Sequence, residues 1–214
     1  MEVLDWDRLA YGEALERQRA RQQARQQGRV EDALIFVEHP TVYTLGMRQG
    51  AREHLLASAG RLAELGVDVV QTERGGDVTC HLPGQLVGYP IVSLERRRDL
   101  HAWLRLLEET LIRTLGCLGV AAHRREGYTG IWLEQRKIAA IGVAVRRWVT
   151  FHGFALNVSN DLAPFDAIVP CGITPEQGRV TTLSRELGRD VDLADVKPVL
   201  ALEFERLLRE YFTD

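Results

Sequence analysis

The sequence has little net charge and no long apolar run. Its 214 residues include 27 basic and 30 acidic side chains, which gives a formal net charge of -3. That balance does not favour binding of nucleic acid through neutralised phosphates. No apolar run approaches the length needed to cross a bilayer, and residues 1–7 show neither part of a secretion signal. We therefore expect a cytoplasmic protein that binds neither nucleic acid nor membrane.

Cysteine is scarce, and the common cofactor motifs are missing. No two of Cys80, Cys117 and Cys171 have the spacing of a zinc or redox motif, so we expect free thiols. The sequence also lacks a Gly-x-x-x-x-Gly-Lys-Ser/Thr phosphate loop, a Gly-x-Gly-x-x-Gly after a strand, and His-Glu-x-x-His. We therefore expect no bound cofactor and no metal ion.

What is present is the pattern of one α+β domain over residues 1–214, with 45% hydrophobic residues for its core. Apolar spacing predicts a helix from a cap at Asp7 to Gln27 and another from a cap at Asp99 to Leu118. Further helices are expected over 180–187 and 192–212. Strands are expected at 33–37, 67–72, 86–94, 128–133, 138–145 and 150–158, the last three as an antiparallel meander. These elements predict a mixed, mainly antiparallel sheet with flanking helices.

Residues 74–90 combine strand-forming residues with four glycines and two prolines, in the order Arg-Gly-Gly-Asp-Val-Thr-Cys-His-Leu-Pro-Gly-Gln-Leu-Val-Gly-Tyr-Pro. Glycines at this density suit a backbone that bends sharply or lets a ligand approach closely, although a tight hairpin would use them too. If residues 78–82 are extended, Thr79 and His81 share one face. Val78, Cys80 and Leu82 would share the other face and join the core.

Cys171 and Lys137 are the candidates for covalent chemistry. Cys171 stands between Pro170 and Gly172, flanks that expose a sulfur, whereas most free cysteines are buried apolar residues. Lys137 precedes an apolar, small-residue strand, where its charge could stabilise a nearby thiolate, although a lysine in a hairpin turn is commonly only solvated. His81 and His152 offer alternative bases.

Five segments together resemble the lipoyl(octanoyl) transferase family, in the same order along the chain. They are residues 39–46 (His-Pro-Thr-Val-Tyr-Thr-Leu-Gly), 74–90, 137–142 (Lys-Ile-Ala-Ala-Ile-Gly), 151–158 (Phe-His-Gly-Phe-Ala-Leu-Asn-Val) and 170–173 (Pro-Cys-Gly-Ile). Residues 161–165 extend the likeness, which covers most of the chain. Two residues depart from the family pattern, since Cys80 stands where tyrosine is usual and Leu82 where glycine is usual.

The resemblance implies an acyltransferase with the fold of the biotin and lipoate protein ligase catalytic domain. Its donor would be octanoyl-acyl carrier protein, and its acceptor a lysine in the lipoyl domain of a 2-oxoacid dehydrogenase or in the glycine cleavage carrier protein, without ATP. By the same resemblance, Cys171 would form the acyl thioester and Lys137 would stabilise its thiolate. The residues implied to bind substrate are Arg74, Gly75, Gly76, Asp77, Val78, Thr79, Cys80, His81, Ala140, Ile141, Gly142, Gly153, Phe154 and Ala155.

Basic residues could dock an acidic carrier protein at two places. Arg17, Arg21 and Arg25 recur on one helix face, where a solvated surface is the simpler explanation. Arg146 and Arg147 are expected to lie nearer the site. Three other functions stay open: an ATP-dependent lipoate ligase, a cysteine hydrolase, and a module that only binds acyl carrier protein. We expect a monomer.

Overall fold

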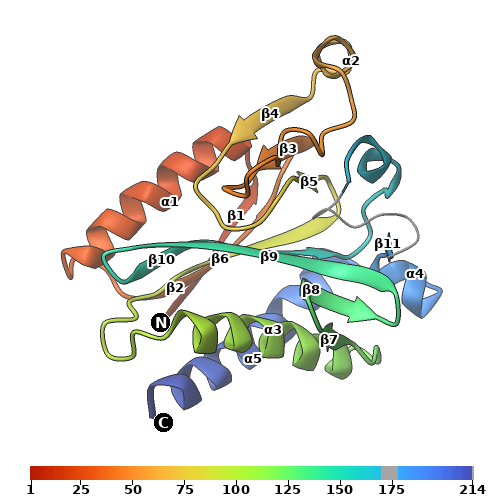
Figure 1. Cartoon of the computed structure of the whole chain (residues 1–214). Coiled ribbons are helices and arrows are strands. Elements are labelled where there is room, and N and C mark those ends of the chain that lie inside the picture. The colour runs from red at the N-terminus through yellow and green to blue at the C-terminus, as the bar shows by residue number, and fades with distance from the viewer. Residues whose placement is uncertain (170–177, 214) are drawn as a thin grey trace.

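The computed structural model describes residues 1–169 and 178–213, and one large mixed sheet runs through its centre (Figure 1). The strand order is β1-β2-β6-β10-β9-β8-β7, with β11 beside β9. Their bounds are β1 Glu2–Arg8, β2 Ala33–Glu38, β6 Gln85–Ile91, β7 His123–Arg125, β8 Tyr128–Leu133, β9 Arg136–Arg146, β10 Val149–Asn157 and β11 Arg179–Val180. Only the β1–β2 and β11–β9 pairs in this sheet are parallel. The predicted α+β fold with a mainly antiparallel mixed sheet is confirmed.

Different elements cover the two faces of the sheet (Figure 1). Helices α3 (Leu100–Cys117) and α5 (Leu193–Thr213) pack together on one face, where Trp103, Leu107 and Phe204 lie fully buried in the main core. On the other face lie α1 (Tyr11–Gln26) and a small sheet of β4 (Asp68–Gln71), β3 (Val42–Leu45) and β5 (Thr79–His81). Short helices α2 (Ala59–Glu64), α4 (Leu183–Leu187) and the 3₁₀ turn η1 (Ala163–Ala167) complete the described elements. Within residues 1–169 and 178–213, no helix has the length and apolarity to cross a membrane.

Most of the predicted elements form as expected, including strands β2, β4 and β6 and helix α5. Strands β8, β9 and β10 form the antiparallel meander. Helix α3 begins after Asp99, whose carboxylate accepts a hydrogen bond from the Ala102 backbone N–H at 2.9 Å. Capping of this kind satisfies an N–H group that has no partner within the helix.

The first predicted helix forms, but its predicted start and its cap at Asp7 are wrong. Residues 2–8 form strand β1 beside β2, and α1 begins only at Tyr11, without a side-chain cap. Asp7 belongs to the strand and has a positive φ of 49°. Tertiary pairing outweighs the local capping signal here, because Leu4 and Trp6 pack against the core cluster beneath α1.

The segment expected as one helix over 180–187 is also divided. Val180 ends strand β11, and Thr182 caps the shorter helix α4 by accepting from the Arg185 N–H. Strand β3 and helix α2 were not predicted.

Candidate active site

A first cavity of about 400 Å³ lies between the glycine-rich segment and strands β9 and β10. The lining includes Arg74, Gly75, Gly76, Asp77, Thr79, His81, Ala140, Ile141, Gly142, Gly153, Phe154 and Ala155. All of these were predicted to bind substrate, and the fold brings them together from segments far apart in the sequence. Tyr11, Tyr89 and His152 also line the cavity.

Glycines let the backbone segments around this cavity approach each other closely. The Gly75 N–H donates to the Val143 carbonyl at 2.9 Å, which fixes the glycine-rich segment against β9. A Cβ at Gly142 would lie 2.8 Å from the Gly75 carbonyl oxygen, closer than a methyl group tolerates. A Cβ at Gly153 would lie 2.2 Å from the Gly88 carbonyl oxygen. Close backbone approach is therefore the physical reason for glycine at both positions.

Alternation along β5 separates the predicted residues into two groups. Thr79 and His81 face the cavity, whereas Val78, Cys80 and Leu82 are almost fully buried in a separate core cluster. The side chains of Val78 and Cys80 therefore do not line the cavity, because successive strand residues point to opposite faces. Burial raises the pKa of the Cys80 thiol, which opposes formation of a thiolate.

Arg74 and Asp77 hold the glycine-rich segment in place. The Arg74 guanidinium donates to the Thr44 carbonyl at 2.7 Å and to the Thr44 hydroxyl at 2.9 Å. The Asp77 carboxylate is buried, and it contacts His54 at 2.7 Å and Arg48 at 3.2 Å. Its second oxygen accepts from the Val78 N–H. Both side chains therefore support the wall of the cavity as well as lining it.

Three buried histidines lie close together beside the first cavity: His81 and His152 line it, and the His39 ring packs against His81 at a centroid distance of 5.6 Å. His39 donates through Nδ1 to the Leu9 carbonyl at 2.7 Å, so its Nε2 accepts from the Tyr89 hydroxyl at 2.7 Å. The Gln85 amide nitrogen donates to Asn157, so its oxygen accepts from the His81 Nδ1–H at 2.8 Å. The Tyr11 ring stacks on His81 with a centroid distance of 5.6 Å. These bonds fix the tautomers of His39 and His81.

Burial keeps these imidazoles neutral. It lowers the pKa of His39 and that of His152 to about 4, and it lowers the pKa of His81 well below its usual value. His152 also has a positive φ of 56°, its backbone N–H donates to Gln18, and its buried Nε2 has no hydrogen-bond partner. Imidazoles with such low pKa values are weak bases at neutral pH, which disfavours a hydrolase that would use His81 or His152 as its base.

Lys137 lies at the junction of the cavities. Its side chain is only 5% exposed, and it lines a second cavity of about 470 Å³. It also lines a small linking cavity of about 20 Å³, together with Thr79, Ala140 and Ala155 of the first cavity. The Lys137 amine is 5.6 Å from the centre of the Trp132 ring. From the sequence, Lys137 was expected just before an apolar strand or in a solvated hairpin turn, and the structure buries it beside two cavities.

Gly130 makes room for this lysine. It has a φ of 112°, and a Cβ there would lie 2.7 Å from Lys137 Cε and 2.4 Å from the Ala139 carbonyl oxygen. Sequence reasoning missed Gly130 and Trp132. An isolated glycine inside an apolar strand was the available signal, since such a glycine often marks close packing.

Cys171 lies outside the described residues. Val169 and Gly178, which stand on either side of residues 170–177, both line the second cavity with Lys137. Within the described part of the chain, no three His, Cys, Asp or Glu side chains are grouped so that they could hold a metal ion.

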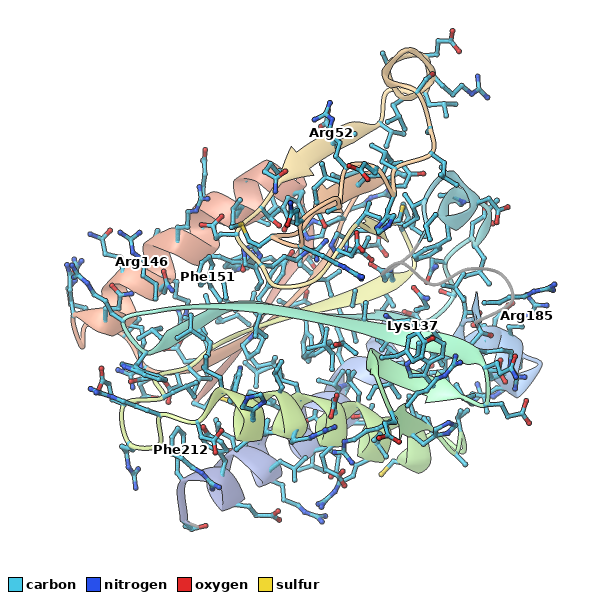
Figure 2. All side chains as sticks on the ribbon, viewed as in Figure 1. Arg52, Lys137, Arg146, Phe151, Arg185 and Phe212 are labelled. Atoms are coloured by element: carbon cyan, nitrogen blue, oxygen red, sulfur yellow. The ribbon has the colours of Figure 1, made fainter. Side chains whose placement is uncertain are left out.

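The arginines expected to lie near the site do not lie near Lys137. Arg146 is nine residues further along β9, about 30 Å away at the rise of an extended strand, and Figure 2 shows the two at opposite ends of that strand. Arg17, Arg21 and Arg25 form ion pairs with Glu13, Glu2 and Asp32 respectively. Their positive charge is therefore largely balanced on the helix surface.

The mixed sheet, covered by α3 and α5 on one face and hollowed on the other, defines the fold of lipoate and biotin protein ligases. A lipoate-protein ligase A crystallised with ATP superposes with a TM-score of 0.84 at 21% identity, over 97% of this chain and 85% of that one. A bi-partite lipoate protein ligase from Thermoplasma acidophilum, studied with its E2 lipoyl domain, gives 0.79 at 19% identity over 97% and 83%. A biotin protein ligase from Aquifex aeolicus with biotin and ATP gives 0.61 at 12% identity over 100% and 72%.

Within that fold class, the chain belongs to the lipoyl protein ligase A/B catalytic domain family, whose model matches residues 10–205. It is 50% identical over 208 residues to the octanoyltransferase of Geobacter sulfurreducens, covering 97% of this chain and 84% of that protein. It is also 50% identical to the octanoyltransferase of Geobacter metallireducens, over 98% and 94%. The octanoyltransferase of Maridesulfovibrio salexigens is 44% identical, over 100% and 97%. The family resemblance seen in the sequence is confirmed.

Proposed function

We propose that this protein is an octanoyltransferase that moves an octanoyl group from octanoyl-acyl carrier protein to the side-chain amine of a lysine in a lipoyl domain. Relatives that carry the name octanoyltransferase support the reaction, since they are about 50% identical over nearly the whole chain. The lipoate ligase studied with its E2 lipoyl domain supports the acceptor. The donor and the acyl-enzyme rest on the sequence motifs around Cys171 and Lys137.

The observation that carries this proposal is the position of Lys137 between two cavities. Its side chain is almost fully buried, which is uncommon for lysine. Lys137 lines both the second cavity and the small linking cavity, and the linking cavity shares Thr79, Ala140 and Ala155 with the first. A substrate that extends through this junction would place its reacting carbonyl beside the amine.

The first step would load Cys171. Its thiolate attacks the carbonyl carbon of the octanoyl thioester, the new C–S bond forms, and the bond to the carrier sulfur breaks. Lys137, as an ammonium ion, would stabilise the Cys171 thiolate by its charge. The carrier leaves as a thiolate and takes the proton of this ammonium group, which leaves Lys137 as an amine. Exchange of one thioester for another is nearly balanced in free energy, so neither ATP nor another co-reactant is needed.

The second step would transfer the group to the acceptor. The amine of the lipoyl-domain lysine attacks the same carbonyl carbon, an amide bond forms and the bond to Cys171 breaks. Lys137 in its amine form would accept the proton that the attacking nitrogen loses. Amides are more stable than thioesters, so this step runs downhill. Positioning of the two reacting groups supplies the remaining rate enhancement.

The first cavity suits the acyl chain. Ala140, Ile141 and Phe154 provide an apolar wall, and the small side chains of Ala140 and Ala155 keep the linking space open. Each buried CH₂ group contributes roughly 0.8 kcal/mol. Most of the octanoyl group's affinity would therefore come from burial in this cavity.

Intact-mass analysis tests the proposal. The protein, incubated with octanoyl-acyl carrier protein without ATP, should gain one octanoyl group, and peptide mapping should place that group on Cys171. Cys171→Ala should abolish the adduct. Lys137→Met should slow formation of the octanoyl adduct at least ten-fold. The control Lys197→Met should not, because Lys197 lies on helix α5, away from the two cavities, where it is paired with Asp5 of β1.

The alternatives give different results in the same experiment. Attachment of free octanoate that requires ATP would identify a ligase, and release of free octanoate would identify a hydrolase. An adduct on Cys80, or carrier binding without any adduct, would overturn the proposed mechanism.

A further inference from the structure

Two arginines at the second cavity form no ion pair within the part of the chain that the structure describes. Arg179 on β11 and Arg185 on α4 both line it, and both are exposed. Neither forms an ion pair with any residue in the ranges 1–169 and 178–213. Nearby Arg136, by contrast, is paired with both Glu186 and Glu134. Two exposed guanidinium groups at the same cavity favour an anionic ligand.

Basic side chains outnumber acidic ones among the described residues that line the second cavity. Asp166 is the one acidic side chain among its described lining residues, against Lys137, Arg179 and Arg185. Glu186 does not add to this negative charge, because it is already bonded to Arg136 and accepts from the Thr181 hydroxyl. Arg125 adds a further positive charge close by, stacked at 4.3 Å over the Tyr128 ring and at 4.9 Å over the Trp132 ring.

The rest of the cavity is mainly apolar. Its walls include Leu56, Trp132, Leu162, Phe165 and Ile168. The parallel pairing of β11 with β9 sets Arg179 beside Arg136 and Val180 beside Lys137, so the arginine and the buried lysine belong to one rigid frame. The cavity thus combines two exposed arginines, apolar walls and the buried Lys137 side chain, and Figure 2 shows Lys137 and Arg185 at the same end of the large sheet.

We propose that this second cavity binds the 4′-phosphopantetheine arm of the donor carrier. The phosphodiester at one end of that arm is an anion that Arg179 and Arg185 would bind, and the thioester at its other end would reach Lys137. The methyl-bearing chain between them would lie against the apolar walls. This inference rests on the proposed octanoyl transfer, and it adds which part of the donor is recognised and by which residues.

The test compares two small donors that differ only in the phosphate, S-octanoylpantetheine and S-octanoyl-4′-phosphopantetheine. The rate of enzyme acylation without ATP gives kcat/KM for each. The wild-type protein should prefer the phosphorylated donor by about ten-fold, the size expected for charge-assisted bonds at an exposed site. The double variant R179A/R185A should lose that preference while keeping its rate with the unphosphorylated donor. R179K/R185K should keep part of the preference, since the positive charge remains.

A matched control uses the other pair of arginines. R146A/R147A removes the same charge at the far end of β9, so it should leave the preference for the phosphorylated donor unchanged. A fall in that variant instead would overturn the assignment to Arg179 and Arg185.

The outcomes separate this inference from the proposed function. Equal rates of the wild-type protein with both small donors would overturn the inference, while transfer from octanoyl-acyl carrier protein would leave the function intact. Equal loss of rate with both donors in R179A/R185A would also overturn it, because that result indicates a structural role. No acylation by any thioester would refute the proposed function itself.

Discussion

The buried histidines predict a strong acid sensitivity of folding. An unfolded histidine titrates near its usual pKa of 6.5, whereas burial lowers the pKa of folded His39 and His152 to about 4. Between pH 6.5 and pH 4 these histidines are protonated in the unfolded chain but remain neutral in the folded chain. The contribution of these histidines to the free energy of unfolding is therefore fully present above pH 6.5 and is lost as the pH falls toward 4. His81 acts in the same direction, since burial lowers its pKa too.

The loss can be worked out from these values. Acidification from pH 7 to pH 4.5 removes on the order of 2 kcal/mol for each histidine whose pKa changes from 6.5 to about 4 on folding. His39 and His152 together then remove roughly 4 to 5 kcal/mol. A domain of ordinary stability has only about 5 to 15 kcal/mol in total. Partial unfolding near pH 4.5 is the expected result.

Urea unfolding at several pH values between 7 and 4.5 measures the effect. His39→Gln and His152→Gln should each lower stability at pH 7, because each removes native contacts, but the free energy of unfolding should then depend less steeply on pH. The difference in slope from wild type should approach 1.4 kcal/mol per pH unit for each histidine. Subtracting the variant from the wild type cancels the acidic groups, which titrate in both. Parallel curves for wild type and variant would refute the reasoning.

Three further predictions concern the site. Gly130→Ala should slow octanoyl transfer at least ten-fold, because the added Cβ would displace Lys137. The control Gly127→Ala should not slow it, since Gly127 also has a positive φ but the added Cβ would have no described neighbour within 4 Å. Single-turnover rates of the two variants make the comparison. Ala140→Leu should lower the ratio of kcat/KM for octanoyl donors to kcat/KM for hexanoyl donors by about fifteen-fold, because the larger side chain removes the space for two CH₂ groups at roughly 0.8 kcal/mol each. An unchanged ratio would mean that the octanoyl chain binds elsewhere. Cys80→Ala should keep the acyl adduct, because the Cys80 side chain is buried in the core away from the first cavity; loss of the adduct by intact mass in a folded variant would contradict this.

Much of the site could be predicted from sequence because its signals are local. Strand alternation correctly put Thr79 and His81 on the cavity side of β5 and Cys80 on the core side. The Asp99 cap and the meander of β8 to β10 likewise depend on neighbouring residues. The family motifs added the pairing of distant segments around one cavity, which no local pattern contains.

The remaining features depend on contacts between distant residues. Strand β1 is held by its pairing with β2, and Asp7, which resembles a helix cap when the sequence is read alone, lies inside this strand. The burial of Lys137 depends on a space left by Gly130 on the neighbouring strand. Arg146 was expected nearer the site, but it is the last residue of the long strand β9, and Lys137 lies at the other end of that strand.

The first and second cavities share no described lining residue, and only the small linking cavity touches both. With the first cavity assigned to the acyl chain and the second to the carrier's arm, as proposed above, the two selectivities would be encoded by separate sets of amino acids. Substitutions in one set would then accumulate without disturbing the other, and the two specificities would be free to diverge independently during evolution. The same separation would let an engineer change the transferred group while keeping the natural donor protein.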